Sequence, residues 1–264
     1  MPVFRRDCGR KGSLGEYKMA KIIDVKGLHY RQANIMLQSA LEEEDEIVVT
    51  NVNGQRYIGA GITGNQRVIV QGTPGNCLAA FMDGLEVIVK GNAQDGVCNT
   101  MNKGRVIIEG DSGDIAGYAM RGGELFIRGD VGYRTGIHMK EYGDVVPTIV
   151  IGGKAGDFLG EYMAGGILVV LGLNLGSEDK IVGSFCGTGM HGGVMYVRGN
   201  VDPSQLGHEV RCVPMEKQDK ELVKGYVERY CRYFGGDPNI ILCLDFKKLI
   251  PYGKRPYGNL YTPN

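Results

Sequence analysis

One segment of this sequence has the spacing of a nucleotide-binding turn. GAGITG, at residues 59–64, matches the pattern G-x-G-x-x-G. Such a turn binds a pyrophosphate only when a helix begins directly after it, because the helix N-terminus presents free N–H groups to the anion. Here the next residues, NQRVIVQG at 65–72, have the β-branched composition of a strand. We therefore interpret GAGITG as a structural turn.

The histidines and cysteines show no arrangement typical of a metal or nucleophilic site. His29, His138, His191 and His208 share no spacing. The seven cysteines are scattered and include no C-x-x-C pair, which favours reduced thiols over zinc, an iron–sulfur cluster or disulfides. No Ser/His/Asp or Cys/His set stands out. The sequence predicts no catalytic, cofactor-binding or metal-binding residue in this chain.

The composition argues against several classes of protein. The 264 residues are 43% apolar, which is enough for a packed core. A net charge of zero, from 30 basic and 30 acidic residues, argues against a nucleic-acid or membrane-surface partner. The start has no signal-peptide core and no apolar run reaches transmembrane length, so we expect a cytoplasmic protein. The 43 glycines are about twice the usual share of ~7%.

The glycines and methionines repeat with a fixed step. Gly72, Gly91, Gly110 and Gly129 close short apolar runs and lie 19 residues apart. The methionines that follow the same frame are Met82, Met101, Met120, Met139, Met163 and Met190. The last two methionine intervals are five and eight residues longer, which we assign to insertions at EYGDVVP and NLGSEDK. A 19-residue unit is too short for a strand, a helix and two turns, so each strand must stack on its copy in the next turn.

The repeat therefore predicts a mainly β fold. We expect a right-handed parallel β-helix of about seven turns with a repeat of ~19 residues, in which glycines form the corners and methionines a core column. The row predicted to face inward is Val70, Val89, Ile108, Ile127, Val150, Val170 and Val197. The row predicted to face outward is Ile69, Ile88, Ile107, Phe126, Ile149, Val169 and Tyr196. Two flanking columns alternate in charge and predict ion pairs between turns, namely Arg67, Glu86, Arg105 and Glu124, and Lys90, Glu109 and Arg128.

The flanks differ from the repeats. Residues 28–42 predict an amphipathic helix with Tyr30, Ala33, Leu37, Ala40 and Leu41 on its apolar face. EIVVTNVNG and RYIGAGI then predict strands. Residues 220–234 predict a second amphipathic helix, with Leu222, Val223, Tyr226, Val227, Tyr230 and Phe234 on one face. The tail at 245–264 predicts an extended arm. We divide the single structural domain into an α/β cap at 1–63, a β-helix at 64–213, and a helix with its tail at 214–264.

The outward row is too apolar to remain exposed to solvent. We expect one of the two amphipathic helices to cover it. Otherwise it is the docking surface for another chain or for a second copy.

Three segments resemble a known family. They are IDVKGLHYRQAN at 23–34, GDFLGEYMAGGILVVLG at 156–172 and FKKLIPYGKRPYG at 246–258. They are similar to the C-terminal glycine-rich (GXGXG) β-helix domain of the large subunit of glutamate synthase, here as a stand-alone subunit. The resemblance implies a non-catalytic scaffold in a complex that converts L-glutamine, 2-oxoglutarate and reductant to two L-glutamates. It also implies FMN and an iron–sulfur cluster in a partner synthase chain, and a glutamine amidotransferase chain as second partner.

No catalytic residue of that family can be carried over. The family's amidotransferase uses an N-terminal cysteine, whereas this chain begins Met1-Pro2-Val3 and Cys8 lies in no amidotransferase sequence. Equivalent subunits of N-methylglutamate synthase and formylmethanofuran dehydrogenase remain alternatives. A β-helix polysaccharide lyase or hydrolase is an alternative of another class. The electron donor, the stoichiometry and self-association stay open.

Overall fold

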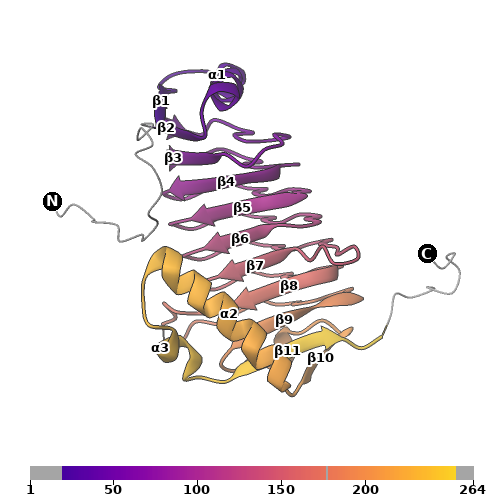
Figure 1. Ribbon diagram of the computed structural model, residues 1–264. Coiled ribbons are helices and arrows are strands. Elements are labelled where there is room, and N and C mark those ends of the chain that lie inside the picture. The colour runs from indigo at the N-terminus through magenta and orange to yellow at the C-terminus, as the bar shows by residue number, and fades with distance from the viewer. Residues whose placement is uncertain (1–19, 177, 254–264) are drawn as a thin grey trace, which may run out of the picture.

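The computed structural model describes residues 20–176 and 178–253, and its main body is a column of stacked parallel strands (Figure 1). The parallel strands are β1 (Lys21–Asp24), β2 (Glu46–Asn53), β3 (Arg67–Thr73), β4 (Asp83–Lys90), β5 (Lys103–Ile108), β6 (Glu124–Ile127), β7 (Thr148–Ile151), β8 (Ala164–Val170) and β9 (Gly192–Arg198). Each strand pairs with the next along the chain, so the predicted mainly β solenoid is confirmed. The coils from β3 to β9 make about six turns, slightly fewer than predicted, because seven strands enclose six intervals.

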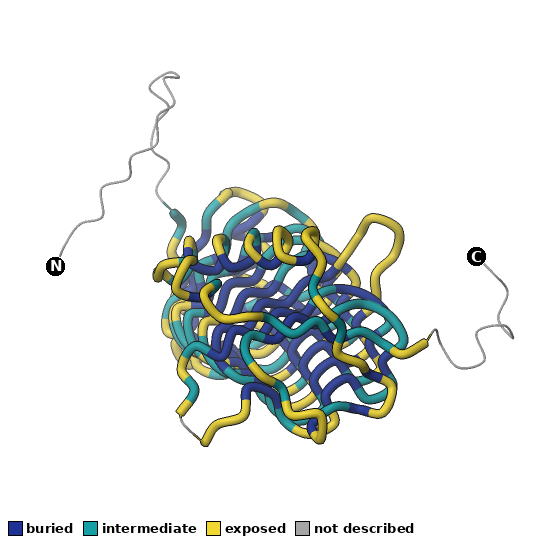
Figure 2. Tube along the Cα trace, turned by 90° about the horizontal axis from the view of Figure 1, so that it is seen from below, coloured by how far each residue is buried: buried dark blue, intermediate teal, exposed yellow. Residues whose placement is uncertain are grey.

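The interior of the coils is dry, and the methionine column is part of it. Each of the six repeat methionines is at most 2% exposed. Figure 2 looks along the stack and shows the buried residues following one another from coil to coil. The predicted insertion at 141–147 is a loop outside this frame, and so are the described residues of the second insertion, 174–176 and 178–180. The methionines therefore have the predicted structural role.

Two overlapping β-turns close the corner of each coil. In the coil before β5, the Asn99 N–H donates to the Gly96 carbonyl and the Met101 N–H to the Cys98 carbonyl. The third residue of each turn is left-handed, with φ of 58° at Cys98 and 53° at Thr100. RYIGAGI was wrongly predicted as a strand, because it supplies the first of these corners, with positive φ at Tyr57, Gly59 and Gly61.

Close approach of the coils requires glycine at positions next to the strands. At Gly72, which has φ of 120°, an added Cβ would lie 2.1 Å from the Val52 carbonyl oxygen in the previous coil. Such a contact forces the backbones apart, so no side chain fits there. The glycine repeat of the sequence is thus a spacing requirement between coils.

The sheet ends with two antiparallel strands. After the short helix η1 (Pro203–Gln205), β10 (Val210–Val213) lies at the sheet edge, and β11 (Phe246–Pro251) inserts between it and β9. The predicted extended arm is the strand β11 over residues 246–251, and its pairing in the sheet was not predicted; β9 has an open edge whose N–H and C=O groups need partners. Residues 254–264 of that tail lie outside the described residues.

Helix α1 (Tyr30–Glu43) covers the N-terminal end of the solenoid (Figure 1). Ala33, Leu37, Ala40 and Leu41 are buried in the same core cluster as the coil interiors, as predicted, whereas Tyr30 is only half-buried. A terminal coil without such a cap would leave its interior open to water.

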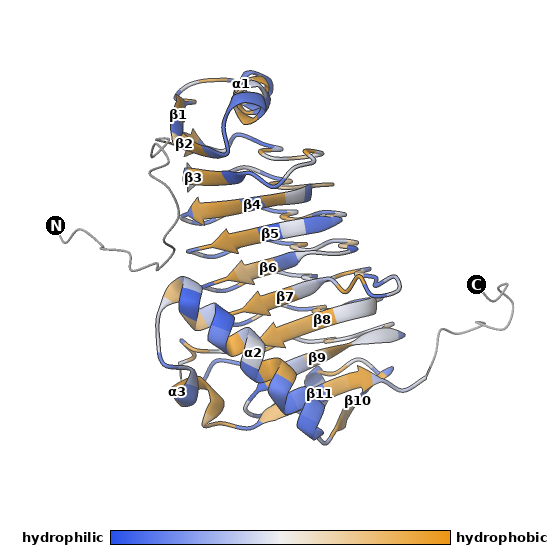
Figure 3. Ribbon diagram, in the orientation of Figure 1, coloured by the Kyte–Doolittle hydropathy of each residue, from blue (hydrophilic) through white to orange (hydrophobic). Residues whose placement is uncertain are grey.

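Helix α2 (Lys217–Phe234) returns over the outer face of β9 to β6, followed by the short helix α3 (Pro238–Leu242) (Figures 1 and 3). Its side chains Val223, Tyr226, Val227 and Tyr230 form one buried cluster with the outer row. Self-cover is therefore confirmed from Phe126 to Tyr196, and Ile107 in the neighbouring coil is also buried, with 4% of its surface exposed. Ile69 and Ile88, in coils beyond the helix, stay half-buried. No helix of the described residues is long and apolar enough to cross a membrane.

One coil was assigned to the wrong faces. Ile127 pairs with Ile151, so Ile151 faces the interior, and Val150 belongs to the outer row under α2. Ile149 is an interior residue, not an outward one. The inserted loop before β7 disturbs the 19-residue count, and a slip of one residue exchanges the two faces of a strand.

Ile107→Asp should destabilise the isolated chain by several kcal/mol, because it places an unpaired charge under cover. Ile69→Asp, the same row position beyond α2, should cost clearly less. Urea denaturation of both variants measures the difference. Equal losses would show that the helix does not cover this row.

Thr135→Val should raise the stability of the chain by about 1 kcal/mol. Thr135 is fully buried in the coil interior, and its hydroxyl has no hydrogen-bond partner among the described residues. A methyl group of similar shape removes this desolvation cost. The control is Val97→Thr, which adds a hydroxyl in the same interior. Thermal unfolding should show a higher Tm for Thr135→Val and a lower Tm for Val97→Thr, each relative to the wild type. A decrease in Tm for Thr135→Val would reveal a hidden partner of the hydroxyl.

Candidate functional site on the solenoid surface

The GAGITG segment lies in a corner of the first coil. No helix follows it, because β3 begins at Arg67 and pairs with β2 and β4. Its glycines Gly59 and Gly61 provide left-handed turn positions. The interpretation of this segment as a structural turn is confirmed.

The four histidines lie apart from one another and have separate local contacts. His29 is the N-cap of α1, and its Nδ1 accepts a backbone hydrogen bond from the first turn. His138 stacks on an aromatic ring, His191 contacts the Gly189 carbonyl through Nδ1 at 3.1 Å, and His208 is exposed. Across residues 20–176 and 178–253, no group of three or more His, Cys, Asp or Glu side chains is placed to hold a metal ion.

The innermost cysteines are inert thiols. Cys98 and Cys186 are completely buried in the coil interior. Burial raises the pKa of the Cys98 thiol far above its usual range and that of Cys186 to about 12. Because the thiolate is the reactive form, neither side chain is suited to nucleophilic chemistry. Six cysteines among the described residues are free thiols, and Cys8 lies outside these residues.

A pocket of about 690 Å³ lies between the N-terminal half of α2, β10 and the start of β11. Val223, Met215 and Phe246 form its apolar part, and Lys220 and Lys247 stand at its polar part. Its lining contains no histidine and no serine. The exposed Cys212 does line the pocket, but no histidine stands beside it to act as its general base.

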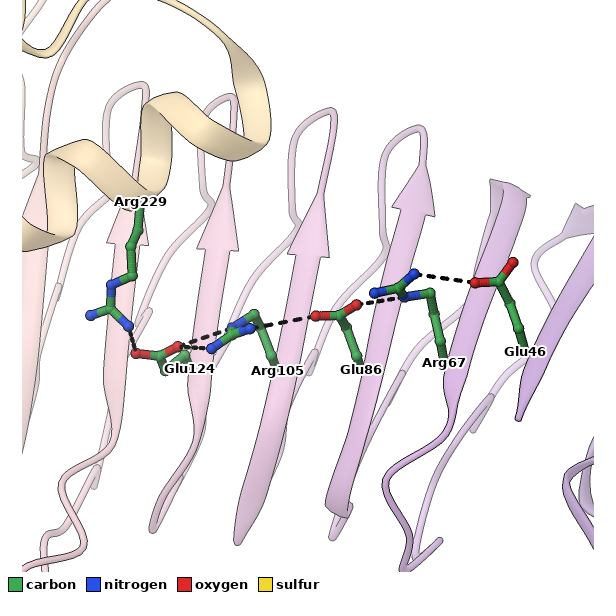
Figure 4. Close-up of polar contacts among 6 residues, drawn as sticks. All are labelled: Glu46, Arg67, Glu86, Arg105, Glu124 and Arg229. Carbon is green, nitrogen blue, oxygen red and sulfur yellow. Dashed lines mark hydrogen bonds and ion pairs between the residues drawn. The ribbon is translucent and has the colours of Figure 1, made fainter. Parts of the chain in front are cut away.

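The predicted charge column forms a continuous ladder on the outer face (Figure 4). Arg67 lies 3.2 Å from Glu46 and 2.6 Å from Glu86, and Arg105 lies 3.4 Å from Glu86 and 2.9 Å from Glu124. The ladder extends beyond the prediction at both ends, to Glu46 in β2 and to Arg229 of α2, which pairs with Glu124. In the second column, Lys90 pairs with Glu109, whereas Arg128 forms no ion pair among the described residues, so the prediction is wrong for Arg128. Arg67 and Arg105 are each neutralised between two carboxylates, so the ladder has a structural role.

A second set of side-chain ladders was missed by the sequence analysis. The Asn92 side-chain oxygen accepts from the Asp111 N–H at 2.9 Å, and Asp111 accepts in turn from the Asp130 N–H at 2.8 Å. A parallel ladder joins Asp95, Asp114 and the Tyr133 N–H. The signal was present, since a Gly-Asp or Gly-Asn pair recurs after the strands at the 19-residue step. These acids satisfy backbone donors between coils and do not form a catalytic pair.

The corners of the lower coils carry two stacks of rings that the sequence analysis also missed. The residues of these two stacks, called the corner face below, are Tyr118, His138 and Tyr162 in one and Arg134, Phe158 and Phe185 in the other. The His138 and Tyr162 rings are parallel with centroids 5.4 Å apart, and Tyr118 meets His138 edge-on at 5.9 Å. Phe158 and Phe185 stack at 5.1 Å, with the Arg134 guanidinium 4.6 Å from the Phe158 ring. Tyr118, Tyr162 and Phe185 are 37%, 47% and 54% exposed.

A buried polar cluster fixes α2 to the last strands. The Asp219 carboxylate accepts from the Tyr196 hydroxyl at 2.6 Å and lies 2.8 Å from Lys248 Nζ. Burial by itself raises the pKa of Asp219, but hydrogen bonds from Lys248, Tyr196 and the Glu216 N–H outweigh it and hold the pKa below its usual value. Burial, together with the bond to Asp219, raises the pKa of Tyr196 above its usual range. The cluster joins α2, β9 and β11 and contains no group poised to transfer a proton near neutral pH.

Asp219→Asn should destabilise the chain by about 3 kcal/mol, because Lys248 loses its counter-charge in a largely buried site. The folded pKa of Asp219 is depressed, so the wild type has this stabilisation above the unfolded pKa of about 3.9 and loses it as the pH falls below that value. The variant should lack this part of the acid dependence. Unfolding free energies between pH 7 and pH 3 measure both effects, with Asp144→Asn in the exposed 141–147 loop as control. Identical slopes for the variant and the wild type below pH 4 would contradict the assignment.

Comparison with known proteins places these features in a family. The chain is 46% identical over 252 residues to the uncharacterized protein MJ1350 of Methanocaldococcus jannaschii, which covers 92% of this chain and 97% of the relative. The GXGXG motif family matches residues 22–251, from β1 to the end of β11. The match includes every corner, where left-handed residues alternate with others as in Gly59-Ala60-Gly61. It also agrees with the resemblance to the glutamate synthase large subunit. This chain therefore belongs to the GXGXG motif family.

Proposed function

We propose that this chain is the non-catalytic scaffold subunit of a split, glutamate synthase-like complex. It positions a glutamine amidotransferase chain against an FMN-bearing synthase chain, which together convert L-glutamine and 2-oxoglutarate to two L-glutamates. The observation that supports this most directly is the GXGXG match over nearly all of the described residues. The proposal places the complex in the cytoplasm and in nitrogen metabolism.

The geometry of the chain suits a scaffold. Strand pairs, side-chain ladders and a docked helix connect each coil to its neighbours, so two points on the surface keep a fixed separation. A fixed separation is what coupled active sites need, since an ammonia intermediate escapes to water when two sites move apart. Cys98 and Cys186 are buried in the coil interior, and the carboxylate of Glu86 is held in an ion pair with Arg67.

The cofactors of the reaction belong to the partner chain in this proposal. An iron–sulfur cluster needs several thiolates that converge on one point. Cys98 and Cys186 lie in separate coils with protonated thiols, and no group of three suitable side chains occurs among the described residues. The side chains described here therefore do not fit a cluster.

Reconstitution tests the proposal. The purified chain alone should show no flavin absorbance and release no ammonia from glutamine. When it is mixed with the amidotransferase and synthase chains of the same organism, glutamine-dependent glutamate formation should rise, and the three chains should co-elute in size-exclusion chromatography.

Two results would contradict this function. Glutaminase turnover or a bound flavin in the isolated chain would give it chemistry of its own. Equal glutamate formation with and without the chain, at saturating concentrations of the other two, would remove its role as scaffold. Ile107→Asp, which disturbs the fold itself, serves as a negative control.

A further inference from the structure

The pocket beside α2 has an apolar inner wall. It lies where the N-terminal half of α2 meets β10 and the start of β11 (Figure 1). Val223 belongs to the buried cluster under α2, and Met215, Leu242 and Phe246 pack against that cluster yet stay only half-buried. All four line the pocket, so its wall is core surface that the chain itself leaves partly uncovered. The volume of about 690 Å³ lies within the usual range of small-molecule sites, about 300–1,000 Å³.

The charged side chains of the lining are not paired with one another. They are Lys220, Lys224 and Lys247, and the carboxylates of Glu221 and Asp245. Among the ion pairs of the described residues, none joins two of these five side chains. Lys224 alone has a carboxylate nearby, that of Glu228, which lies 3.9 Å away on the exposed side of the same helix. The pocket therefore presents unpaired charges to a molecule that enters it.

The position of Lys247 determines which charge the ligand should carry. Lys247 is the only half-buried residue of the five, whereas the other four are exposed to water. Its neighbour Lys248 points to the opposite face of β11, where it pairs with Asp219. Lys247 has no ion pair and no side-chain hydrogen bond among the described residues. A partly desolvated ammonium group without a counter-charge gains most from an anion, while the exposed carboxylates keep their hydration.

We propose that this pocket binds an amphipathic carboxylate, a small molecule with an anionic head and an apolar body. The carboxylate lies at Lys247, and the hydrocarbon or aromatic body lies against Met215, Val223 and Phe246. An apolar wall with a few placed polar groups is the usual composition of such a site. The ligand contacts α2, β10 and β11 together, so it binds only the folded chain and stabilises it. This binding site is independent of the scaffold role.

Three compounds with the same body and different head groups test the ligand class. They are phenylbutyrate, phenylbutanol and phenylbutylamine, each titrated into the purified chain and followed by calorimetry. The acid should bind at least about tenfold more tightly than the alcohol, and the amine should bind most weakly. The acid should also raise Tm the most. Equal affinity for acid and alcohol, a preference for the amine, or no binding of any of the three at millimolar concentration would overturn the proposal.

Substitutions separate the head-group contact from the apolar wall. Lys247→Met removes the charge and keeps most of the apolar length, so the affinity for phenylbutyrate should fall about tenfold, to that of phenylbutanol. Lys140→Met is the matched control, because Lys140 is exposed and does not line the pocket. Leu244→Ser, at a lining residue that is 49% exposed, should weaken the binding of acid and alcohol alike. Wild-type affinity of Lys247→Met for the acid would contradict the assignment.

The Cys212 thiol reports directly on occupation of the pocket. Cys212 is exposed and lines the pocket, whereas Cys243 is exposed and does not line it. Phenylbutyrate should slow the alkylation of Cys212 by iodoacetamide and leave that of Cys243 unchanged, as measured by mass spectrometry of peptides. In Lys247→Met the same concentration should give much less protection. Calorimetric binding without protection of Cys212 would place the ligand elsewhere and overturn this site.

Discussion

The hydrogen bonds between successive coils are the constraint on which the rest of this structure depends. Every coil must return its strand to the register of the one before, so that donors and acceptors of the two backbones meet. Pairs such as Val87 with Val106 and Val106 with Leu125 keep this register. Where the chain gains residues, as in the 141–147 loop, they are excluded from the coil and leave the ladder intact. If the added residues entered the coil, buried backbone N–H and C=O groups of the parallel strands would lose their hydrogen-bond partners, which is costly.

Side chains add to the backbone hydrogen bonds between coils, because the repeat places equivalent positions of successive coils directly next to one another. A column of identical charges would repel, and the outer face alternates Glu and Arg from β2 to β6. The Asp and Asn columns avoid the same problem differently, since each carboxylate accepts an N–H from the next coil. Individually such contacts are worth little at an exposed site, about 0.2–1 kcal/mol for an ion pair. Repeated along the stack, they hold the coils at a common rotation.

The solenoid has an apolar face that is covered by its own helix and a corner face that is exposed. Helix α2 closes the apolar outer row over the last coils and is fastened by the Tyr196, Asp219 and Lys248 cluster and by Arg229. The row over the first coils stays half-buried. The corner face remains open and keeps rigid rings in an unfavourable backbone conformation. The described residues thus form a regular stack in which the apolar cover and the exposed rings lie on different faces.

Much of this architecture was predictable from the sequence, because the same pattern of residues recurs in each coil and forms the same local structure there. The step of Gly91, Gly110 and Gly129 predicted parallel coils, and the step of Met101, Met120 and Met139 predicted an interior column. Alternating charges predicted the ion-pair ladder. The family resemblance was also visible in the sequence, whereas composition and spacing contained no signal for a reaction.

Only the tertiary structure decided what happens where the repeat is interrupted or ends. The insertion before β7 concealed the register, so Val150 and Ile151 were exchanged between faces. RYIGAGI has a residue composition that resembles a strand, yet it forms a corner. Its backbone dihedral angles depend on the closure of the whole coil. The strand β11 and the path of α2 follow from open edges and apolar rows that exist only once the coils are stacked. Local sequence determines what recurs within 19 residues, but contacts across many coils are decided by the assembled stack.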